Sequence, residues 1–200
     1  MTSRIEKKFV ISDPLSFYKF INAYNGNEIY YQRKILSIYF DNEVMQSYSD
    51  ADEGTRPRRK IRLRKYYPVN FILNKKKLSE FFNQSFSLEK KITSFNNNYK
   101  IVNKIIFNNN YLNLIDKQYG FLRPVSIVLY DRRYFKILND RITFDFNIRY
   151  FTVTKDNSFF FKNILKKYVV EFKAGQNNFL SQYYNFSNLQ SRYSKYLSSI

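Results

Sequence analysis

The sequence predicts an α+β fold built mainly from antiparallel strands, because charged and apolar residues alternate along many of its short segments. The clearest case is the segment 56–66. Side chains of a strand alternate between its two faces, so three cations share one face and two aliphatic residues share the other. The cations are Lys60, Arg62 and Arg64, and the aliphatic residues are Ile61 and Leu63. Taken alone, this pattern is typical of a basic surface strand whose apolar face covers the core.

The same alternation returns in other segments, so a single basic surface strand does not account for the sequence. In the segment 141–150 it is nearly strict, with Asp145 and Arg149 on one face and Phe144 and Ile148 on the other. Further segments are predicted to carry charged or polar faces of the same kind. They group Tyr130 with Arg132, Glu171 with Lys173, Arg4 with Glu6 and Lys8, and Glu89 with Lys91.

Two architectures accommodate so many charged strand faces. In a sandwich, the apolar faces share one core and the charged faces meet water. In a closed sheet of about eight antiparallel strands, the charged faces line the lumen and helices cover the apolar outside. Cations crowded into a lumen repel one another and lose hydration, so such a barrel needs acidic partners, water or a polyanionic ligand. A closed barrel with this sequence would be an anion site.

Composition narrows the chemistry. The 200 residues suit one domain with a proper core, and 34 Lys and Arg against 16 Asp and Glu give a net charge of +18. This charge calls for a polyanionic partner, and nucleic acid, an anionic membrane and polyphosphate all qualify. The sequence contains no cysteine and no histidine, which excludes thiolate chemistry and imidazole bases or ligands. Any metal must then rest on carboxylate and phosphate oxygens, which favours Mg²⁺ or Mn²⁺.

The start of the first helix is well marked. Asp13 suits the N-cap and Pro14 the first helical position. A second strand is expected at 30–41, followed by a short helix or turn at 42–49 and a polar loop at 50–57. An apolar stripe at helical spacing predicts that the first helix packs on the outside of the sheet. The stripe consists of Leu15, Tyr18, Ile21 and Tyr24.

The rest of the chain is expected to alternate between helices and strands. A small Lys-rich helix is expected at 74–83 and a longer helix at 103–119. The tripeptide 138–140 suits a hairpin tip, since Asn and Asp tolerate tight-turn backbone angles. The aromatic run 159–161 is either an edge strand or a short helix. From Phe179 onward the chain is expected to be helical.

Short motifs recur in a characteristic order over nearly the whole chain. They are Arg4-Ile-Glu6-Lys-Lys8-Phe, Ser37-Ile-Tyr39-Phe-Asp41, Arg59-Lys-Ile-Arg62-Leu-Arg64, Leu88-Glu89-Lys-Lys91, Arg123-Pro-Val-Ser-Ile-Val-Leu-Tyr130-Asp-Arg132, Arg141-Ile-Thr-Phe-Asp145, Val170-Glu171-Phe-Lys173 and Ser194-Lys195-Tyr196. In this order they resemble the VTC domain, the polyphosphate polymerase domain of the vacuolar transporter chaperone complex. That domain is a branch of the triphosphate tunnel metalloenzymes. Because each motif is short, the resemblance rests on the whole ordered set.

The resemblance implies a closed barrel that forms a basic tunnel, within a single domain at 1–200, with a C-terminal helix capping the tunnel. It also implies a set of functional residues. The catalytic positions are Arg62, Arg64, Arg132, Arg141 and Lys195, the phosphate-binding positions are Lys8, Lys91, Tyr130 and Ser194, and the metal-binding carboxylate is Glu171. Glu6 and Glu89 either assist the metal through water or balance neighbouring cations, and we favour the second role.

The implied reaction transfers the γ-phosphate of ATP to a growing polyphosphate chain, with Mn²⁺ or Mg²⁺ as the divalent ion. Arginine presents a planar fork that grips two phosphate oxygens, and lysine acts as a compact charge. Phosphoryl transfer needs mainly positioning and charge neutralisation. The acceptor phosphate is already ionised, so the reaction needs no histidine base.

Other functions remain open on the sequence. With water as acceptor the protein would be a triphosphatase, and without turnover it would be a polyphosphate sensor. A nucleic-acid binder fits the charge, but no nucleic-acid motif is present and no such partner is expected. The charges could also form paired networks that bind no ligand, which would leave the positive excess unexplained.

We expect a cytoplasmic protein. The segment Met1–Lys8 leads straight into a charged strand instead of a signal peptide, and no apolar run reaches the roughly 18 residues of a membrane-spanning helix. The resemblance is compatible with a partner in a membrane complex.

Overall fold

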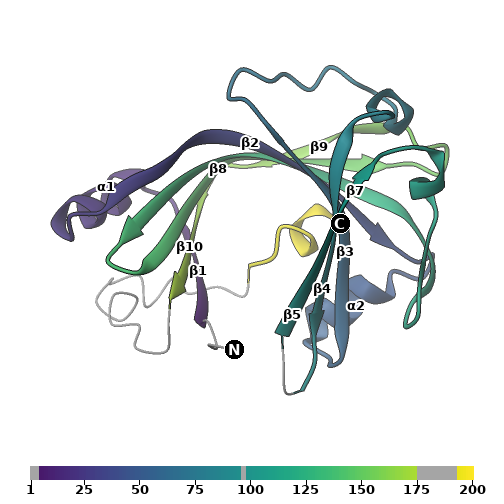
Figure 1. Cartoon of the computed structure of the whole chain (residues 1–200), viewed down its shortest axis with the longest axis horizontal. Coiled ribbons are helices and arrows are strands. Elements are labelled where there is room, and N and C mark those ends of the chain that lie inside the picture. The colour runs from purple at the N-terminus through teal and green to yellow at the C-terminus, as the bar shows by residue number, and fades with distance from the viewer. Residues whose placement is uncertain (1–4, 96–97, 175–192) are drawn as a thin grey trace. The chain divides into compact units, whose positions relative to one another are not determined.

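The computed structural model describes residues 5–95, 98–174 and 193–200 (Figure 1). The helix expected from Phe179 onward lies mostly outside these residues. Near the C-terminus, the described part has a short 3₁₀ helix, η4 (Leu197–Ser199). The chain divides into two compact units. The first unit comprises Met1–Lys34, Tyr130–Ile148 and Ile164–Tyr193, and the second comprises Ile35–Leu129, Arg149–Asn163 and Ser194–Ile200.

The described residues are predominantly antiparallel sheet with few helices, so the α+β class is confirmed. The strands are β1 (Ile5–Ile11), β2 (Asn27–Asp41), β3 (Arg58–Tyr67), β4 (Ser85–Thr93), β5 (Asn98–Ile106), β6 (Leu114–Asp116), β7 (Gly120–Ile137), β8 (Asp140–Val153), β9 (Phe159–Leu165) and β10 (Tyr168–Ala174). The α-helices are α1 (Pro14–Ala23) and α2 (Gln46–Glu53), and two further 3₁₀ helices are η1 (Leu78–Phe81) and η2 (Asn109–Leu112).

The expected closure of the barrel is not seen. The strands follow the order β1-β10-β8-β7-β2-β3-β4-β5, with β6 paired to β7 and β9 to β8. In this order β1 and β5 are the two ends, and no pairing joins them within the described residues. The sheet is therefore open where the sequence led us to expect a closed ring. Alternation along a strand shows which face is charged, but it carries no information on whether two distant edge strands meet.

The core of the first unit is aromatic and lies between α1 and strands β1, β7, β8 and β10. The Asp13 side chain caps α1 as expected and accepts from the backbone N–H groups of Leu15 and Ser16. Phe17 stacks on Phe144 at 4.6 Å between ring centroids. The expected stripe is only partly correct: α1 buries Phe17, Phe20 and Ile21, while Leu15 is 65% exposed. The bulkier phenylalanines turn the buried face away from the predicted one.

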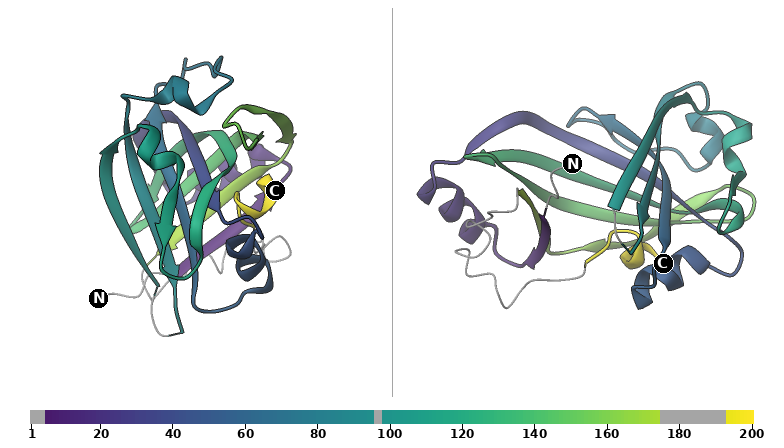
Figure 2. Two further views of the ribbon diagram at one scale, coloured as in Figure 1. Left: turned by 90° about the vertical axis from the view of Figure 1, so that its right-hand side faces the viewer. Right: turned by 60° about the horizontal axis from the view of Figure 1, so that its bottom comes forward.

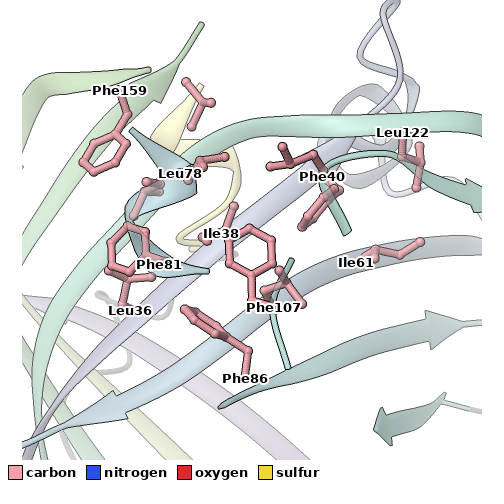
Figure 3. Close-up of a cluster of buried hydrophobic side chains, with 14 of the residues drawn as sticks. Leu36, Ile38, Phe40, Ile61, Leu78, Phe81, Phe86, Phe107, Leu122 and Phe159 are labelled. Carbon is pink, nitrogen blue, oxygen red and sulfur yellow. The ribbon is translucent and has the colours of Figure 1, made fainter. Parts of the chain in front are cut away.

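The core of the second unit is shown in Figure 3. Ile61 and Leu63 of β3 enter it, as their alternation predicts, together with Phe86 of β4 and Phe81 of η1. This arrangement settles which face of β3 is buried. The cations of β3 therefore lie on the opposite face. Strands β4 and β5 continue the sheet beside β3 (Figures 1 and 2).

Several local predictions are confirmed. The second strand, the hairpin tip between β7 and β8, and a strand at the 159–161 aromatic run are all present. Leu138 at the hairpin tip has a φ of 52°. The alternation predicted for β8 fails beyond Asn147, whose φ of 51° interrupts the extended backbone, and Phe151 instead packs on the second unit's core.

Three predicted helical segments are wrong or displaced. The helix expected at 103–119 is the end of β5 followed by η2 and β6, because Val102 and Ile105 pair with β4 across a hairpin. The Lys-rich helix expected at 74–83 is reduced to η1. The helix expected near 42–49 begins later and runs into the predicted loop as α2.

Candidate functional site

Strands β3, β4 and β5 place like charges directly opposite one another. Lys60 pairs in register with Lys91, and Lys91 with Lys100. Opposed residues of neighbouring strands project from the same face, where like charges are destabilising unless something between them compensates. We call this side of the three strands the cation face. Its members are Lys60, Arg62, Arg64, Ser87, Glu89, Lys91, Lys100 and Lys104.

Glu89 is the buried carboxylate of the cation face, and cations surround it. Arg62 Nε lies 2.7 Å from Glu89 Oε2, and Lys100 Nζ lies 2.6 Å from Oε1. Arg64 Nη1 is 3.5 Å from Oε2. Burial would raise the pKa of Glu89, but the charges of Arg62, Arg64 and Lys100 lower it to about 2. Glu89 is therefore ionised at neutral pH and orients the guanidinium groups, as its expected balancing role requires.

The next pair of positions along the strands extends the positive charge. Arg64 lies opposite Ser87, and Ser87 lies opposite Lys104. A pocket of about 340 Å³ adjoins this end of the cation face. It is lined by Arg64, Lys65, Tyr66, Ser85, Phe86, Ser87 and Lys104. An anion held at this end would meet a guanidinium, a hydroxyl and an ammonium group.

Two hydroxyl groups of β2 support the arginines. Ser37 Oγ accepts from Arg64 Nε at 3.3 Å, and the Tyr39 hydroxyl accepts from Arg62 Nη1 at 3.1 Å. Burial would raise the pKa of Tyr39, but the positive charges of Arg62, Arg64 and Lys195 lower it. A phenol among cations responds in this way because positive neighbours stabilise its ionised form. The charge of Lys195 contributes to this lowering of the Tyr39 pKa.

In the first unit, a second group of charges is paired. The guanidinium of Arg132 binds Asp145 in two places, with Nε 2.5 Å from Oδ1 and Nη2 2.7 Å from Oδ2. Lys173 Nζ lies 2.7 Å from Glu171 Oε1, and Lys8 Nζ lies 3.0 Å from Glu6 Oε1. We call this group the paired cluster. Its members are Glu6, Lys8, Arg132, Asp145, Glu171 and Lys173.

Glu171 is ionised, as a carboxylate that binds a metal ion must be. Burial would raise the pKa of Glu171, but Lys173, Lys8 and Arg132 hold it well below its ordinary value, so the carboxylate is ionised. Thr143, opposite Glu171 in register, has a buried hydroxyl oxygen without a hydrogen-bond partner. Within the described residues, no three acidic side chains gather into a metal site. Glu171 alone could then take a hard ion such as Mg²⁺ together with phosphate oxygens and water, in exchange for its ion pair with Lys173.

The site residues expected from the sequence fall into both units. Lys60, which was not among them, donates to Ser194 Oγ at 3.0 Å. Tyr130 is buried, and the guanidinium carbon of Arg132 lies 5.3 Å from its ring centroid. Arg141 is exposed and lies opposite Lys173. Arg62, Arg64, Lys91, Ser194 and Lys195 belong to the second unit, and Lys8, Tyr130, Arg132, Arg141 and Glu171 to the first.

Sequence reasoning missed several residues of these groups. Lys60 was placed on the charged face with Arg62 but was not included among the expected site residues. Either Lys100 or Lys104 could be the family's further basic strand residue, but the sequence at 66–104 resembles the family too weakly to assign one of them. The hydroxyl of Tyr39 gave no sequence signal of its own, since its role depends on where Arg62 points.

A comparison with protein families supports the resemblance that the sequence motifs indicate. A family model described as VTC domain matches residues 4–200. No curated protein matches the chain. Within the described residues, none of the helices has the length and apolar character that crossing a bilayer demands.

Solved structures share the fold at low sequence identity. A conserved hypothetical protein from Pyrococcus furiosus is 15% identical with a TM-score of 0.56, covering 99% of this chain and 100% of its own. A Vibrio parahaemolyticus protein provisionally assigned as an adenylate cyclase is 10% identical with a TM-score of 0.55, covering 100% and 99%. The Hippeastrum protein HpAC1, described as having a dominant triphosphatase activity, is 10% identical with a TM-score of 0.51, covering 97% and 93%.

Proposed function

The chain belongs to the VTC domain family, and we propose that it is a polyphosphate polymerase that transfers the γ-phosphate of ATP to the end of a phosphate chain. The observation that carries this proposal is the row of Lys60, Lys91 and Lys100 in register across three strands. Lys100 is bound by Glu89 and Lys60 by Ser194, yet three ammonium groups on one face still concentrate positive charge that a bound anion would offset. The row is therefore a reason to assign an anionic ligand to the cation face.

A phosphate chain suits the spacing of the cation face. Successive rows on one face of a sheet are two residues apart, or about 6.6 Å along each strand. The row of Lys60 and the row of Arg64 thus mark the ends of a stretch of about 13 Å that an extended polyanion could follow. A polyanion with one charge on every phosphate can contact cations at both ends of this stretch.

Nucleic acid suits the cation face less well. Proteins that bind single strands without sequence preference stack bases on accessible aromatic rings. Tyr39, the ring that contacts Arg62, is only 4% exposed and its face is covered by Tyr196. Tyr66, which lines the pocket, is 44% exposed and could stack one base, whereas the face offers forks and ammonium groups to several phosphates.

In the proposed reaction, the arginine forks and lysines of the cation face bind the phosphates, orient them and offset their charge. Arg62 and Arg64 are held in place by Glu89, Tyr39 and Ser37, so their donors are preorganised. Ser194 adds a hydroxyl and Lys195 a charge. In the first unit, Glu171 is the carboxylate that we assign to a divalent ion, which would neutralise phosphate oxygens when bound. The terminal oxygen of the phosphate chain, which is already ionised, bonds to the γ-phosphorus while the bond to the β–γ bridging oxygen breaks and ADP leaves, so no residue needs to remove a proton.

The test is incubation of the protein with ATP and Mn²⁺ or Mg²⁺, with products separated by phosphate-chain length on a gel. We expect long chains from the wild type and their loss in Arg62→Ala and Glu171→Gln. The matched control is Arg133→Ala, because Arg133 also binds a carboxylate through two nitrogens, that of Glu28. Orthophosphate without chains would identify a triphosphatase. Binding of polyphosphate without either product would identify a sensor.

A further inference from the structure

The C-terminal segment Ser194–Ile200 is fixed within the second unit by a buried tyrosine. Tyr196 is 1% exposed, and its hydroxyl donates to Asp41. Burial and the nearby carboxylate of Asp41 raise the pKa of Tyr196, so the phenol keeps the proton that it donates. The segment also lies against α2 (Figure 2).

Asp41 is a rigid acceptor for this hydrogen bond. Its carboxylate accepts from the backbone N–H groups of Ser47 and Tyr48 near the start of α2, each at 2.9 Å, and from that of Asn42 at 2.8 Å. Asp41 itself is completely buried. A carboxylate held by several backbone donors has little freedom to move, so it fixes the position of the phenol that binds it.

The ring of Tyr196 connects the segment to the cation face. It stacks on Tyr39 with ring centroids 5.0 Å apart and 24° between the planes. Tyr39 accepts in turn from Arg62. The two residues just before Tyr196 are Ser194 and Lys195. The Ser194 hydroxyl accepts a hydrogen bond from Lys60, and the positive charge of Lys195 helps to lower the pKa of Tyr39. One side chain thus fixes the backbone on which two expected site residues are carried.

We propose that Tyr196 is a positioning residue that holds Ser194 and Lys195 against the cation face through its bond to Asp41 and its stack on Tyr39. This inference rests on the proposed function, because it assigns those two residues to phosphate binding. Tyr196 does not touch the phosphate in this scheme. It acts by limiting the freedom of the segment, so that Lys195 loses little entropy when the anion binds.

A second anchor makes this role testable without loss of the fold. Ser199 Oγ lies 2.8 Å from Ser126 Oγ and donates to the carbonyl oxygen of Tyr196 at 2.6 Å. In Tyr196→Phe the ring and its stack remain, the Ser199 anchor remains, and Asp41 keeps its backbone donors. The variant therefore removes the bond to Asp41 and keeps the fold, while the segment loses one of its anchors.

The experiment measures tripolyphosphate binding by calorimetry in a double-mutant cycle. Tyr196→Phe is made in the wild type and in the Ser194→Ala/Lys195→Gln background. Tyr119→Phe is the comparison variant, because its hydroxyl also donates to a carboxylate, that of Asp50, at 2.9 Å, and it accepts in addition from the backbone N–H of Arg59 at 3.0 Å. Unfolding in urea is measured for every variant.

We expect Tyr196→Phe to weaken binding about 10-fold in the wild type and less than about 2-fold in the background variant. The comparison variant should lose stability without this dependence on the background. Equal losses in both backgrounds, or no loss in the wild type, would overturn the positioning role. A wild type that does not bind tripolyphosphate would overturn the proposed function, and the positioning role with it.

Discussion

The cation face and the paired cluster are both rich in arginine and lysine, yet their charges are arranged in opposite ways. In the paired cluster each cation meets a carboxylate, as Arg132 meets Asp145 and Lys173 meets Glu171. On the cation face, lysines oppose lysines in register, and several cations share the carboxylate of Glu89. In the paired cluster the opposite charges offset one another. On the cation face the cations outnumber the one carboxylate, that of Glu89.

Charges on similar strands can therefore either stabilise the fold as ion pairs or attract an anionic ligand. A buried ion pair whose hydrogen bonds are made is stable without a ligand, and removing one partner is costly. Opposed like charges weaken the protein and gain from a bound anion. Variants of the paired cluster should therefore change stability most, and variants of the cation face should change binding most.

The largest effect is expected for Arg132→Ala. The substitution leaves Asp145, which is completely buried, without its guanidinium partner, and such a loss costs about 3–5 kcal/mol. Urea unfolding measures the change. In Arg133→Ala the side chain of the partner Glu28 is 34% exposed, so the loss should stay below about 1 kcal/mol. Equal losses in the two variants would contradict the distinction between buried and exposed pairs.

An intermediate effect is expected in acid for Glu89. Its pKa in the folded protein, about 2, lies below its ordinary value of 4.5. A lowered pKa gives stability that is present above about pH 4.5 and is lost as the pH falls towards 2. Over that window the wild type should lose up to about 3 kcal/mol more than Glu89→Gln. Urea unfolding at several pH values measures the difference, and parallel curves for the two proteins would refute it.

The smallest effect on stability, and one of opposite sign, is expected for Lys91→Gln. Removing the middle charge of the lysine row should stabilise the protein without anions by about 0.2–1 kcal/mol. The same change should weaken tripolyphosphate binding. Lys90→Gln is the control on the neighbouring position, because Lys90 pairs with Asp116 and its loss should destabilise. A destabilised Lys91→Gln would show that the row is not repulsive.

Much of the fold could be predicted because alternation and capping are local signals. The burial of Ile61 and Leu63 and the Asp13 cap followed directly from sequence. Pairing between distant segments could not be predicted. The residues at 103–106 have helical spacing as well as β-branched side chains, and only the neighbouring β4 decides in favour of a strand.

The candidate site could be predicted in part. Arg62, Arg64 and Lys91 were identified by alternation and resemblance, and the structure brings them to one face. The pairing of Arg132 with Asp145 was not foreseen, because both lie on charged faces but their partners depend on the register of β7 with β8. Tyr196 was part of a recognised motif, but its contact with Asp41 joins residues that are 155 positions apart.

The central claim is that the cation face binds a phosphate chain, and calorimetry with tripolyphosphate tests it most directly. The variant Lys60→Ala/Lys91→Ala/Lys100→Ala removes the lysine row. The control variant Lys117→Ala/Lys155→Ala/Lys166→Ala removes the same charge from exposed positions elsewhere. We expect the first to bind at least about 100-fold more weakly than the wild type and the control to stay within about 3-fold. Equal losses in both would mean that only net charge attracts the anion and would contradict the claim.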